Sequence, residues 1–289
     1  MPRNFTRRWF RYMGLALLIS HLAGGVWLLA EQELKPGELV AKSLAALGAP
    51  EARAAVKTRV MTGDGSMAFL EGETWGLPGP ARFASDAGRA LFEWRFGHHD
   101  YEAEQLLFDG KDVKVEHMLP PVRSPLATFV RDYASALLRE GIWGGVTNVG
   151  WALASSRKLQ IKYRGIKELQ GKKVQVLRYQ AAKSGNLKVD LGFDPETYRH
   201  VVSEYSLEIP VRGVVDKKSY DVSAGVMSTY WKVSEEFDDF RAVDGITLPH
   251  SYKVRVTYNG QSSLIAEWRA AFSEVKHNQE LGADVFTLR

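Results

Sequence analysis

The sequence predicts a mainly β fold of the α+β class, in which an antiparallel sheet is interrupted by a few helices. Three observations lead to this prediction. Apolar and polar residues alternate over most of the chain after residue 52, turn-forming residues separate these stretches at hairpin spacing, and one central segment has helical spacing instead. Alternation with a period of two is typical of strands, and successive strands joined by tight turns form a meander rather than a parallel sheet.

The first thirty residues have the composition of an export signal. Four arginines precede an uncharged stretch from Tyr12 to Ala30, and secretion machinery reads this order of a basic and an apolar segment. We expect residues 1–30 to be a signal peptide or an uncleaved signal anchor whose residues 12–30 span the inner membrane. Thr6–Phe10 also resembles a twin-arginine signal, although an ordinary basic segment is the favoured interpretation. Either way, we expect residues 31–289 on the periplasmic side.

The charge balance and the cysteine count exclude several classes of protein. Without residues 1–30, the chain has 34 basic and 34 acidic side chains, so it has no general attraction for a nucleic acid backbone. The chain contains no cysteine, which excludes disulfides, thiolate metal sites, cysteine nucleophiles and lipid attachment to an N-terminal cysteine. No linker or repeat divides residues 31–289, so we expect a single domain there.

The strand-forming stretches follow a short helix. Glu38–Leu47 is rich in alanine and leucine at helical spacing, and a glycine and a proline follow it. We predict strands over residues 90–96, 106–108, 113–118, 159–163, 174–179, 187–193, 201–209, 227–240, 246–258 and 264–276. Residues 90–96 alternate as a half-buried strand does. The predicted turns are Gly63–Ser66, Asp194–Thr197, Val243–Gly245 and Asn259–Gly260, the last as a type I′ hairpin. Pro210–Gly225 is interpreted as a long loop or a protruding hairpin.

A helical interruption follows residue 123. Ser124 is a suitable N-cap and Pro125 suits the first helical turn. Five apolar residues recur on one face of this helix: Leu126, Phe129, Val130, Tyr133 and Leu137. We expect this face to pack against the concave side of the sheet.

No catalytic motif stands out in the sequence. It contains neither a glycine-rich phosphate loop nor a Gly-x-Ser-x-Gly elbow. His98, His99 and Asp100 are the strongest metal candidates, but neighbouring strand residues point to opposite faces, so both histidines reach one ion only if they lie in a turn. A polar turn is the favoured interpretation, and a hydrolase using these three residues is the least favoured function. The acidic pairs 235–236 and 238–239 are interpreted as a solvated face. We therefore predict no enzyme, no catalytic residue, no metal and no cofactor.

Aromatic residues suggest a ligand site. A curved sheet needs a cover on its concave face, and the few predicted helices cover a wide sheet only in part. The remainder is either an apolar groove for a hydrophobic ligand or ordinary core, and for any single residue the two are equally favoured. The predicted ligand-binding residues are Phe92, Trp94, Phe96, Leu106, Phe108, Phe129, Trp143 and Trp151.

Several short stretches resemble the LolA-like family of outer-membrane lipoprotein-sorting proteins. They are residues 41–44, 47–49, 166–174, 237–249, 275–278 and 285–288. The resemblance implies a sheet curved into an unclosed half-barrel around a few helices, with acyl chains held in its apolar hollow. It also implies a polar residue that gates the hollow, for which the sequence indicates no position. The chain departs from the family in being longer than its compact carrier and in lacking the cysteine that the receptor-type member carries.

Two functions follow as hypotheses. The first is a LolA-like lipid-binding domain, residues 31–289, that carries lipids or lipoprotein acyl chains through the periplasm as a transport chaperone. The alternative is an envelope-stress sensor module of the same fold, anchored at the inner membrane. The expected partners are lipids or lipoprotein acyl chains and membrane proteins of the inner or outer membrane, and no nucleic acid. A retained anchor would favour the sensor, because a carrier must leave the inner membrane.

The first testable prediction concerns processing. Because the arginines, the apolar stretch and Ala30 stand in the order of a cleavable signal, the mature protein should begin near Glu31. N-terminal sequencing of protein isolated from the cell envelope checks this. Recovery of an intact Met1 would contradict cleavage and favour the anchored sensor.

Overall fold

The computed structural model describes residues 34–71, 75–115, 123–155, 159–181, 185–210, 228–260 and 262–288. Residues Leu34–Arg289 form one compact unit. The predicted export segment, residues 116–118 of the strand predicted at 113–118 and nearly all of the loop predicted at Pro210–Gly225 lie outside the described residues.

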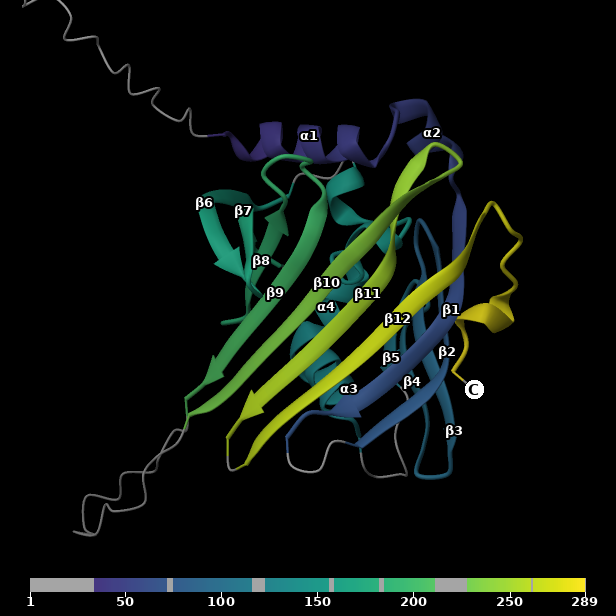
Figure 1. Cartoon of the computed structure of the whole chain (residues 1–289), viewed down its shortest axis with the longest axis vertical. Helices are drawn as coiled ribbons and strands as arrows, with labels where there is room; N and C mark the ends of the chain where they lie inside the picture. Colours follow the sequence, from purple (N-terminus) through teal and green to yellow (C-terminus); the bar gives the residue numbers. More distant parts are fainter. Residues whose placement is uncertain are drawn as a thin grey trace, which may run out of the picture. The chain divides into compact units, whose positions relative to one another are not determined.

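Twelve strands form one antiparallel sheet that does not close (Figure 1). The strands are β1 (Thr58–Phe69), β2 (Trp75–Asp86), β3 (Ala90–His98), β4 (Tyr101–Phe108), β5 (Val113–Val115), β6 (Ile161–Leu169), β7 (Lys172–Tyr179), β8 (Lys188–Phe193), β9 (His200–Ile209), β10 (Thr229–Val243), β11 (Ile246–Asn259) and β12 (Ser263–His277). Their spatial order is β5-β4-β3-β2-β1-β12-β11-β10-β9-β8-β7-β6. Two meanders therefore meet where β1 pairs with β12, and β5 and β6 form the two edges. The predicted mainly β fold with an unclosed half-barrel is confirmed.

Local turn chemistry fixes several hairpins where the sequence predicted them. The Asp194 carboxylate accepts hydrogen bonds from the backbone N–H groups of Glu196 (3.1 Å) and Thr197 (2.7 Å), which closes the turn between β8 and β9. Between β10 and β11, Asp244 and Gly245 have φ angles of 51° and 77°. Two successive positive φ angles are what a two-residue hairpin with the right-handed strand twist requires.

Two predicted turns differ in the structure. Gly63–Ser66 is not a turn but lies inside β1, next to an irregularity in register between Thr62 and Gly63. A Cβ on Gly63 would lie 1.9 Å from the carbonyl oxygen of Ala271, so glycine is needed there for the close approach of β12. Beyond β11, Asn259 pairs with Ser263, so the connection is one residue longer than the predicted type I′ hairpin.

The helices form two groups. At the start of the described chain lie α1 (Pro36–Leu47) and α2 (Pro50–Ala55); the sequence predicted α1 but not α2. Between β5 and β6 lie α3 (Pro125–Phe129), the π-helical turn η1 (Val130–Ala134), α4 (Ser135–Arg139) and the 3₁₀ turns η2 (Gly145–Thr147) and η3 (Ala152–Ala154). No helix in the described part of the chain combines the length and apolarity that crossing a membrane would require.

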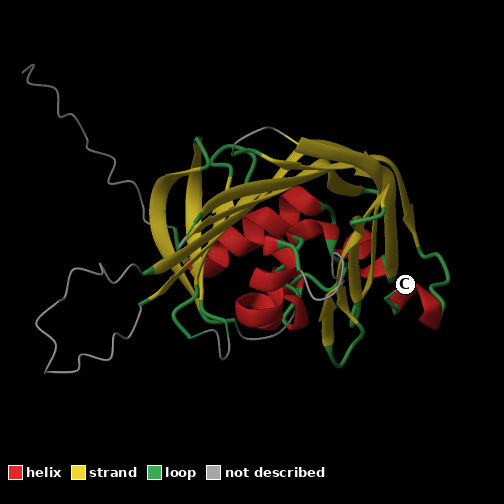
Figure 2. Ribbon diagram, turned by 90° about the horizontal axis from the view of Figure 1, so that it is seen from below, coloured by secondary structure: helices red, strands yellow, loops and turns green. Residues whose placement is uncertain are grey.

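We call residues 123–155 the helical plug, because they fill the concave side of the sheet (Figure 2). The plug begins as predicted: the Ser124 side chain accepts a hydrogen bond from the Ala127 N–H at 2.9 Å. Four of the five residues on the predicted apolar face are fully buried, and Tyr133 is partly buried against the same cluster. The sequence therefore identified the side of this helix that faces the sheet.

The two faces of the sheet are covered differently. On the concave face, Phe92 and Trp94 of β3 belong to one large hydrophobic cluster that also contains the plug. On the outer face, Leu91 packs with Phe286 of the C-terminal 3₁₀ helix η4 (Ala283–Phe286) in a smaller cluster. The prediction of a half-buried strand at residues 90–96 is therefore wrong for its first half, because the C-terminal segment covers the second face.

The packing of the plug yields a testable prediction. Phe129 is fully buried and lies 5.8 Å from the ring of Trp231 on β10. Phe129→Asp places an unpaired carboxylate there and should lower the free energy of unfolding by roughly 3–5 kcal/mol, as loss of a buried aromatic and burial of a charge both destabilise. Urea denaturation of the two proteins measures the difference. The half-buried neighbour Thr128 provides the control, because Thr128→Asp places a carboxylate in the first helical turn. Equal stability of Phe129→Asp and the wild type would contradict the packing.

Candidate functional site

All eight residues predicted to bind ligand meet on the concave face, around the plug. Six of them, Phe92, Trp94, Leu106, Phe129, Trp143 and Trp151, are buried members of the large cluster, and Phe96 and Phe108 are partly buried against it. The first three of these, with Phe96 and Phe108, come from β3 and β4, and the other three come from the plug. The structure thus brings the predicted residues together, with plug side chains packed against sheet side chains.

The contact between the plug and the sheet is close. Gly144 of the plug has a φ of 77°, and a Cβ at this position would lie 2.3 Å from the ring of Phe92. The Trp143 ring stacks on Tyr205 of β9, with ring centroids 5.2 Å apart and planes inclined by 15°. Trp151 stacks in the same way on His200, at 5.5 Å and 16°. The glycine therefore lets the plug backbone lie close to the sheet, and the stacked rings pack the plug side chains against sheet side chains.

A buried carboxylate lies at the centre of this contact. Glu235 of β10 is fully buried and accepts hydrogen bonds from the hydroxyl groups of Tyr205 and Tyr252 (2.6 Å for Tyr252). It also accepts one from the backbone N–H of Gly144 at 2.8 Å. Burial raises the pKa of the Glu235 carboxyl from 4.5 to about 7, although the three hydrogen bonds oppose this shift. Glu235 therefore joins the sheet to the plug through a group that titrates near neutral pH.

This position corrects one interpretation of the sequence. The solvated face predicted for Glu235 and Glu236 fits only the second residue, and only in part, because Glu236 is paired with Lys253 at 2.7 Å on the other face. Glu235 shares the inward face of β10 with Val233 and Phe237, both fully buried. The alternation of β10 places it inward, and hydrogen bonding makes the burial of its polar atoms tolerable.

A second buried carboxylate holds the beginning of the plug. Glu104 of β4 accepts a hydrogen bond from the Ser124 hydroxyl at 2.9 Å and another from the Tyr101 hydroxyl. The indole N–H of Trp268 donates in turn to the Tyr101 oxygen at 2.9 Å. Burial and the neighbouring Glu104 hold the pKa of Tyr101 well above its ordinary value of 10. Tyr101 therefore stays protonated and remains a donor.

A buried arginine holds the far end of the plug. Nη1 of Arg59, on β1, donates to the carbonyl oxygens of Val146 (2.7 Å) and Thr147 (3.2 Å). Its Nε donates to Nε2 of His277 at 3.1 Å, and Nδ1 of that histidine lies 3.0 Å from the Asp244 carboxylate. Burial lowers the pKa of Arg59 from 12.5 to about 10, so the guanidinium remains charged at neutral pH. Arg59 therefore joins β1 to the far end of the plug.

Sequence patterns did not single out Arg59, Glu104 or Glu235 as buried polar residues, although a signal was present. Arg59 and Glu104 each stand two residues from a buried apolar residue of the same strand, Met61 for Arg59 and Leu106 for Glu104. Strand alternation therefore places each on the inward face. Polar residues at inward positions of a strand were the available clue.

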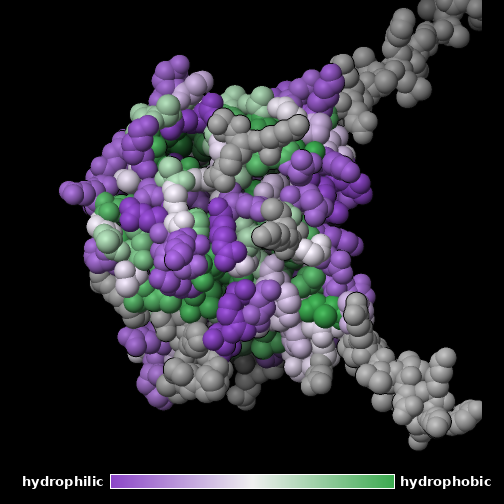
Figure 3. Space-filling model, turned by 180° about the vertical axis from the view of Figure 1, so that it is seen from behind, coloured by the Kyte–Doolittle hydropathy of each residue, from purple (hydrophilic) through white to green (hydrophobic). Residues whose placement is uncertain are grey.

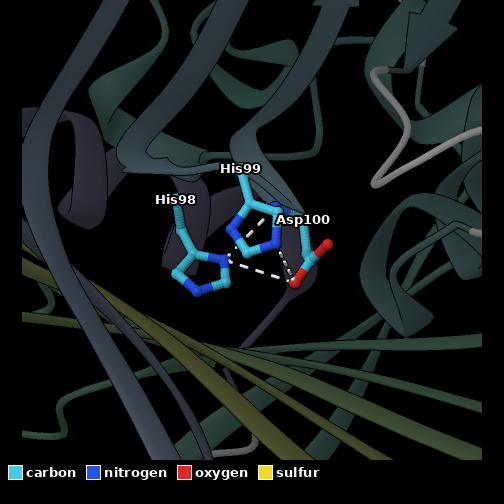
Figure 4. Close-up of side chains that lie close together, drawn as sticks. All are labelled: His98, His99 and Asp100. Carbon is cyan, nitrogen blue, oxygen red and sulfur yellow. Dashed lines mark hydrogen bonds and ion pairs between the residues drawn. The ribbon is translucent and has the colours of Figure 1, made fainter.

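The candidate metal cluster lies away from the plug, at the tip of the hairpin between β3 and β4 (Figure 4). Oδ2 of Asp100 lies 3.0 Å from Nε2 of His99 and 4.0 Å from Nδ1 of His98, and one ligand atom of each residue lies within 4.8 Å of the others. His98 ends β3, and His99 and Asp100 form the turn that follows, so the strand-geometry objection does not apply. The His99 side chain is 82% exposed, as expected of a polar turn, and the absence of a metal remains a prediction.

The surface on the side opposite to that of Figure 1 is mixed. Figure 3 shows apolar residues reaching the surface in several places between polar ones. The described large apolar residues that are exposed, Leu70, Ile166 and Tyr230, are exposed by only 38–39%. The apolar surface is therefore scattered, as is normal for a folded domain.

The titration of Glu235 yields a testable prediction. Between pH 4.5 and about 7 the folded protein holds the Glu235 proton more tightly than the unfolded chain does, so this carboxyl lowers the free energy of unfolding as pH rises through that range. Glu235→Gln removes this titration. Relative to the wild type, the variant should gain up to about 1.4 kcal/mol per pH unit across the range and nothing further above it.

Urea denaturation of both proteins between pH 4.5 and 8 checks the prediction. His200 acts in the opposite direction, because burial lowers its pKa from 6.5 to about 3 and stability then rises with pH over that interval. Its contribution is common to both proteins and cancels in their difference. A difference that does not change with pH would show that Glu235 does not titrate in this way.

Comparison with known proteins gives structural matches only. No protein-family model and no curated protein matches the chain. Its fold is similar to those of a LolA superfamily protein from Nitrosomonas europaea (13% identity, 88% of this chain and 98% of that one, TM-score 0.47) and an outer membrane lipoprotein-sorting protein domain from Vibrio parahaemolyticus (14%, 86% and 97%, 0.42). It is also similar to a DUF1329 family protein from Desulfovibrio piger (10%, 88% and 98%, 0.40). The first two matched proteins are of the lipoprotein-sorting kind that stretches of the sequence also resemble.

Proposed function

We propose that residues 31–289 are a periplasmic binding or carrier domain for lipids or lipoprotein acyl chains, and not an enzyme. One observation carries this proposal. The concave face of the unclosed sheet is apolar and aromatic, and a separate segment of the chain, the helical plug, covers it. A ligand of the same apolar character would bind where the plug now packs.

The way in which the plug is held supports an exchange of this kind. Polar contacts tie it to the sheet at its beginning (Ser124 to Glu104), in its middle (Gly144 to Glu235) and towards its end (Arg59 to the Val146 carbonyl). Because water replaces it on opening, each such hydrogen bond contributes about 0.5–1.5 kcal/mol net where both groups are neutral and about 1.5–3 kcal/mol where one is charged. These contacts therefore fix the position of the plug and still allow it to move away.

An acyl chain would gain free energy from burial in the hollow. Removing apolar surface from water contributes about 25 cal/mol per Å², or about 0.8 kcal/mol for each buried methylene group. Six to eight methylene groups would contribute roughly 5–6 kcal/mol by this measure. Displacing the plug reduces the net affinity, since only the fraction of molecules in the open state binds.

In the sensor alternative, ligand would bind to the same concave face. Binding would then act on a membrane protein partner instead of leading to transport of the ligand. The sensor requires an anchor at residues 12–30 and a membrane protein partner. Co-purification of a membrane protein with the uncleaved chain, without transferable lipid, would support the sensor and contradict the carrier.

The first test of the proposal is ligand binding and its dependence on the plug. A fluorescent fatty-acid probe should bind the purified wild type. Ser124→Ala removes the N-cap and the contact with Glu104, which should destabilise the closed plug by about 1 kcal/mol. If the plug must open, apparent probe affinity should rise up to about fivefold in this variant while the melting temperature falls.

Ser273→Ala is the matched control, because Ser273 is exposed on β12 and distant in sequence from the plug. It should leave both probe affinity and melting temperature unchanged. Failure of the well-folded wild type to bind any acyl probe or to carry lipid on purification would overturn the carrier proposal.

Trp94 supplies a separate test of what the buried aromatics do. Trp94 is fully buried, packs edge-on against Phe83 at 5.1 Å, and donates from Nε1 to the Arg269 carbonyl at 2.8 Å. These contacts predict that Trp94→Ala lowers the free energy of unfolding by roughly 3–5 kcal/mol. Melting and probe titration of the same sample distinguish a core residue from a groove wall: a wall would lose probe affinity with little loss of stability.

A further inference from the structure

A pocket of about 250 Å³ lies under α2, at the end of the hollow where Arg59 holds the plug. It is lined by Leu47, Pro50, Arg53, Ala54, Val56, Arg59, Val146, Asn148, Val149, Trp151, Ala154 and Ile246. Pockets that enclose a whole drug-sized ligand measure about 300–1,000 Å³. This one therefore suits a single chemical group rather than a complete lipid.

The charge of the pocket has one sign. Arg53 and Arg59 line it, and none of its lining residues is acidic. The partners of Arg59 are the two plug carbonyl groups and the imidazole of His277, none of which carries a negative charge. The carboxylate of Asp244 lies beyond that imidazole, and its side chain is 69% exposed. The buried guanidinium thus lacks a direct counter-ion among the described residues, and a buried charge is costly without one.

Two further donors, on residues that line the pocket, have no acceptor among the described residues. Nη2 of Arg59 makes no hydrogen bond within the described chain, since its bonds run from Nε and Nη1. The indole Nε1 of Trp151 is buried and has no acceptor among the described residues. A buried donor such as Nε1 of Trp151 almost always has a partner in folded proteins. An oxygen-rich ligand group would supply the missing acceptors.

The pocket also adjoins the apolar hollow. Trp151 and Val146 line the pocket and belong to the large cluster on the concave face. Both residues belong to the plug, so a ligand whose polar end occupies the pocket reaches the hollow when the part of the plug before Val146 moves away and residues 146–154 stay in place. An acceptor group and an apolar chain in one molecule are the features of an amphiphile.

We propose that this pocket binds the anionic headgroup of an amphiphile, a carboxylate or a phosphate, with Arg53, Arg59 and Trp151 as its donors. This inference rests on the proposed function, because the chain of the amphiphile would occupy the hollow. It narrows the cargo from lipids in general to lipids with an anionic headgroup. Charge-assisted hydrogen bonds from a guanidinium to such oxygens are stronger than neutral ones.

The test compares ligands that share one chain and differ in the headgroup. Oleate and oleyl alcohol are titrated against the purified protein at pH 8 by displacement of the fluorescent probe. Oleate should bind at least tenfold more tightly than the alcohol. Arg53→Gln should reduce this preference to about twofold and change the affinity for the alcohol little, whereas Arg164→Gln, at an exposed position on β6, should leave the preference intact.

The wild-type comparison alone decides the inference, so the result does not depend on the folding of a variant. Equal binding of oleate and oleyl alcohol would overturn the inference that the pocket selects an anionic headgroup, and it would not affect the carrier proposal. Binding of neither ligand would overturn the carrier proposal itself. Acetate and inorganic phosphate are titrated in the same way. If either binds as tightly as oleate, the pocket is a site for a free anion, and the proposal of an amphiphilic ligand is wrong.

Discussion

An unclosed sheet leaves a concave apolar face that must be kept from water, and most of the structure follows from how this chain meets that requirement. The sheet of twelve strands, built from two meanders, stops short of closure at β5 and β6, and the chain between these two edges supplies the helical plug. The segment that crosses from one edge to the other is therefore also the segment that covers the hollow. The plug is continuous with the strands along the chain, yet it forms no strand and takes no part in the hydrogen bonds of the sheet. It can consequently change its position without breaking the sheet.

The polar groups inside this contact decide how specific and how reversible the cover is. A hollow filled only by apolar side chains would accept a plug in several positions, because dispersion and burial have little directional preference. Glu104, Glu235 and Arg59 each receive or supply hydrogen bonds at one defined place on the plug. These contacts favour one position, since any other leaves a buried charge or a buried backbone group unsatisfied. They contribute less to stability than the aromatic packing does, and more to its uniqueness.

The sequence predicted the sheet, the meander and the inward face of the plug because each rests on local patterns: period-two alternation in the strands, turn residues such as Asp194, and the helical spacing from Leu126 to Leu137. It failed where a distant segment decides. The Gly63–Ser66 stretch has turn composition, but Gly63 makes room for β12, which lies some two hundred residues further along the chain. The alternation around Leu91 predicted a half-buried strand because the C-terminal helix that covers this residue is not local. The acidic composition around Glu235 favoured a solvated face, and the tyrosine partners that make its burial possible lie on two other strands.

The same features that hold the plug set the energetics of ligand exchange. Because the closed state fills the hollow with its own side chains, a bound acyl chain replaces apolar contacts by other apolar contacts, and the net gain is far smaller than the buried area alone suggests. A carrier benefits from this near balance, since it must give up its cargo as readily as it takes it. A charged headgroup would tip such a balance, because it would give Arg59 a negatively charged partner and would supply an acceptor to Nε1 of Trp151, which has none in the closed state. Selectivity for the ligand would then come from a few polar atoms of the pocket under α2, while the hollow would bind acyl chains of different lengths.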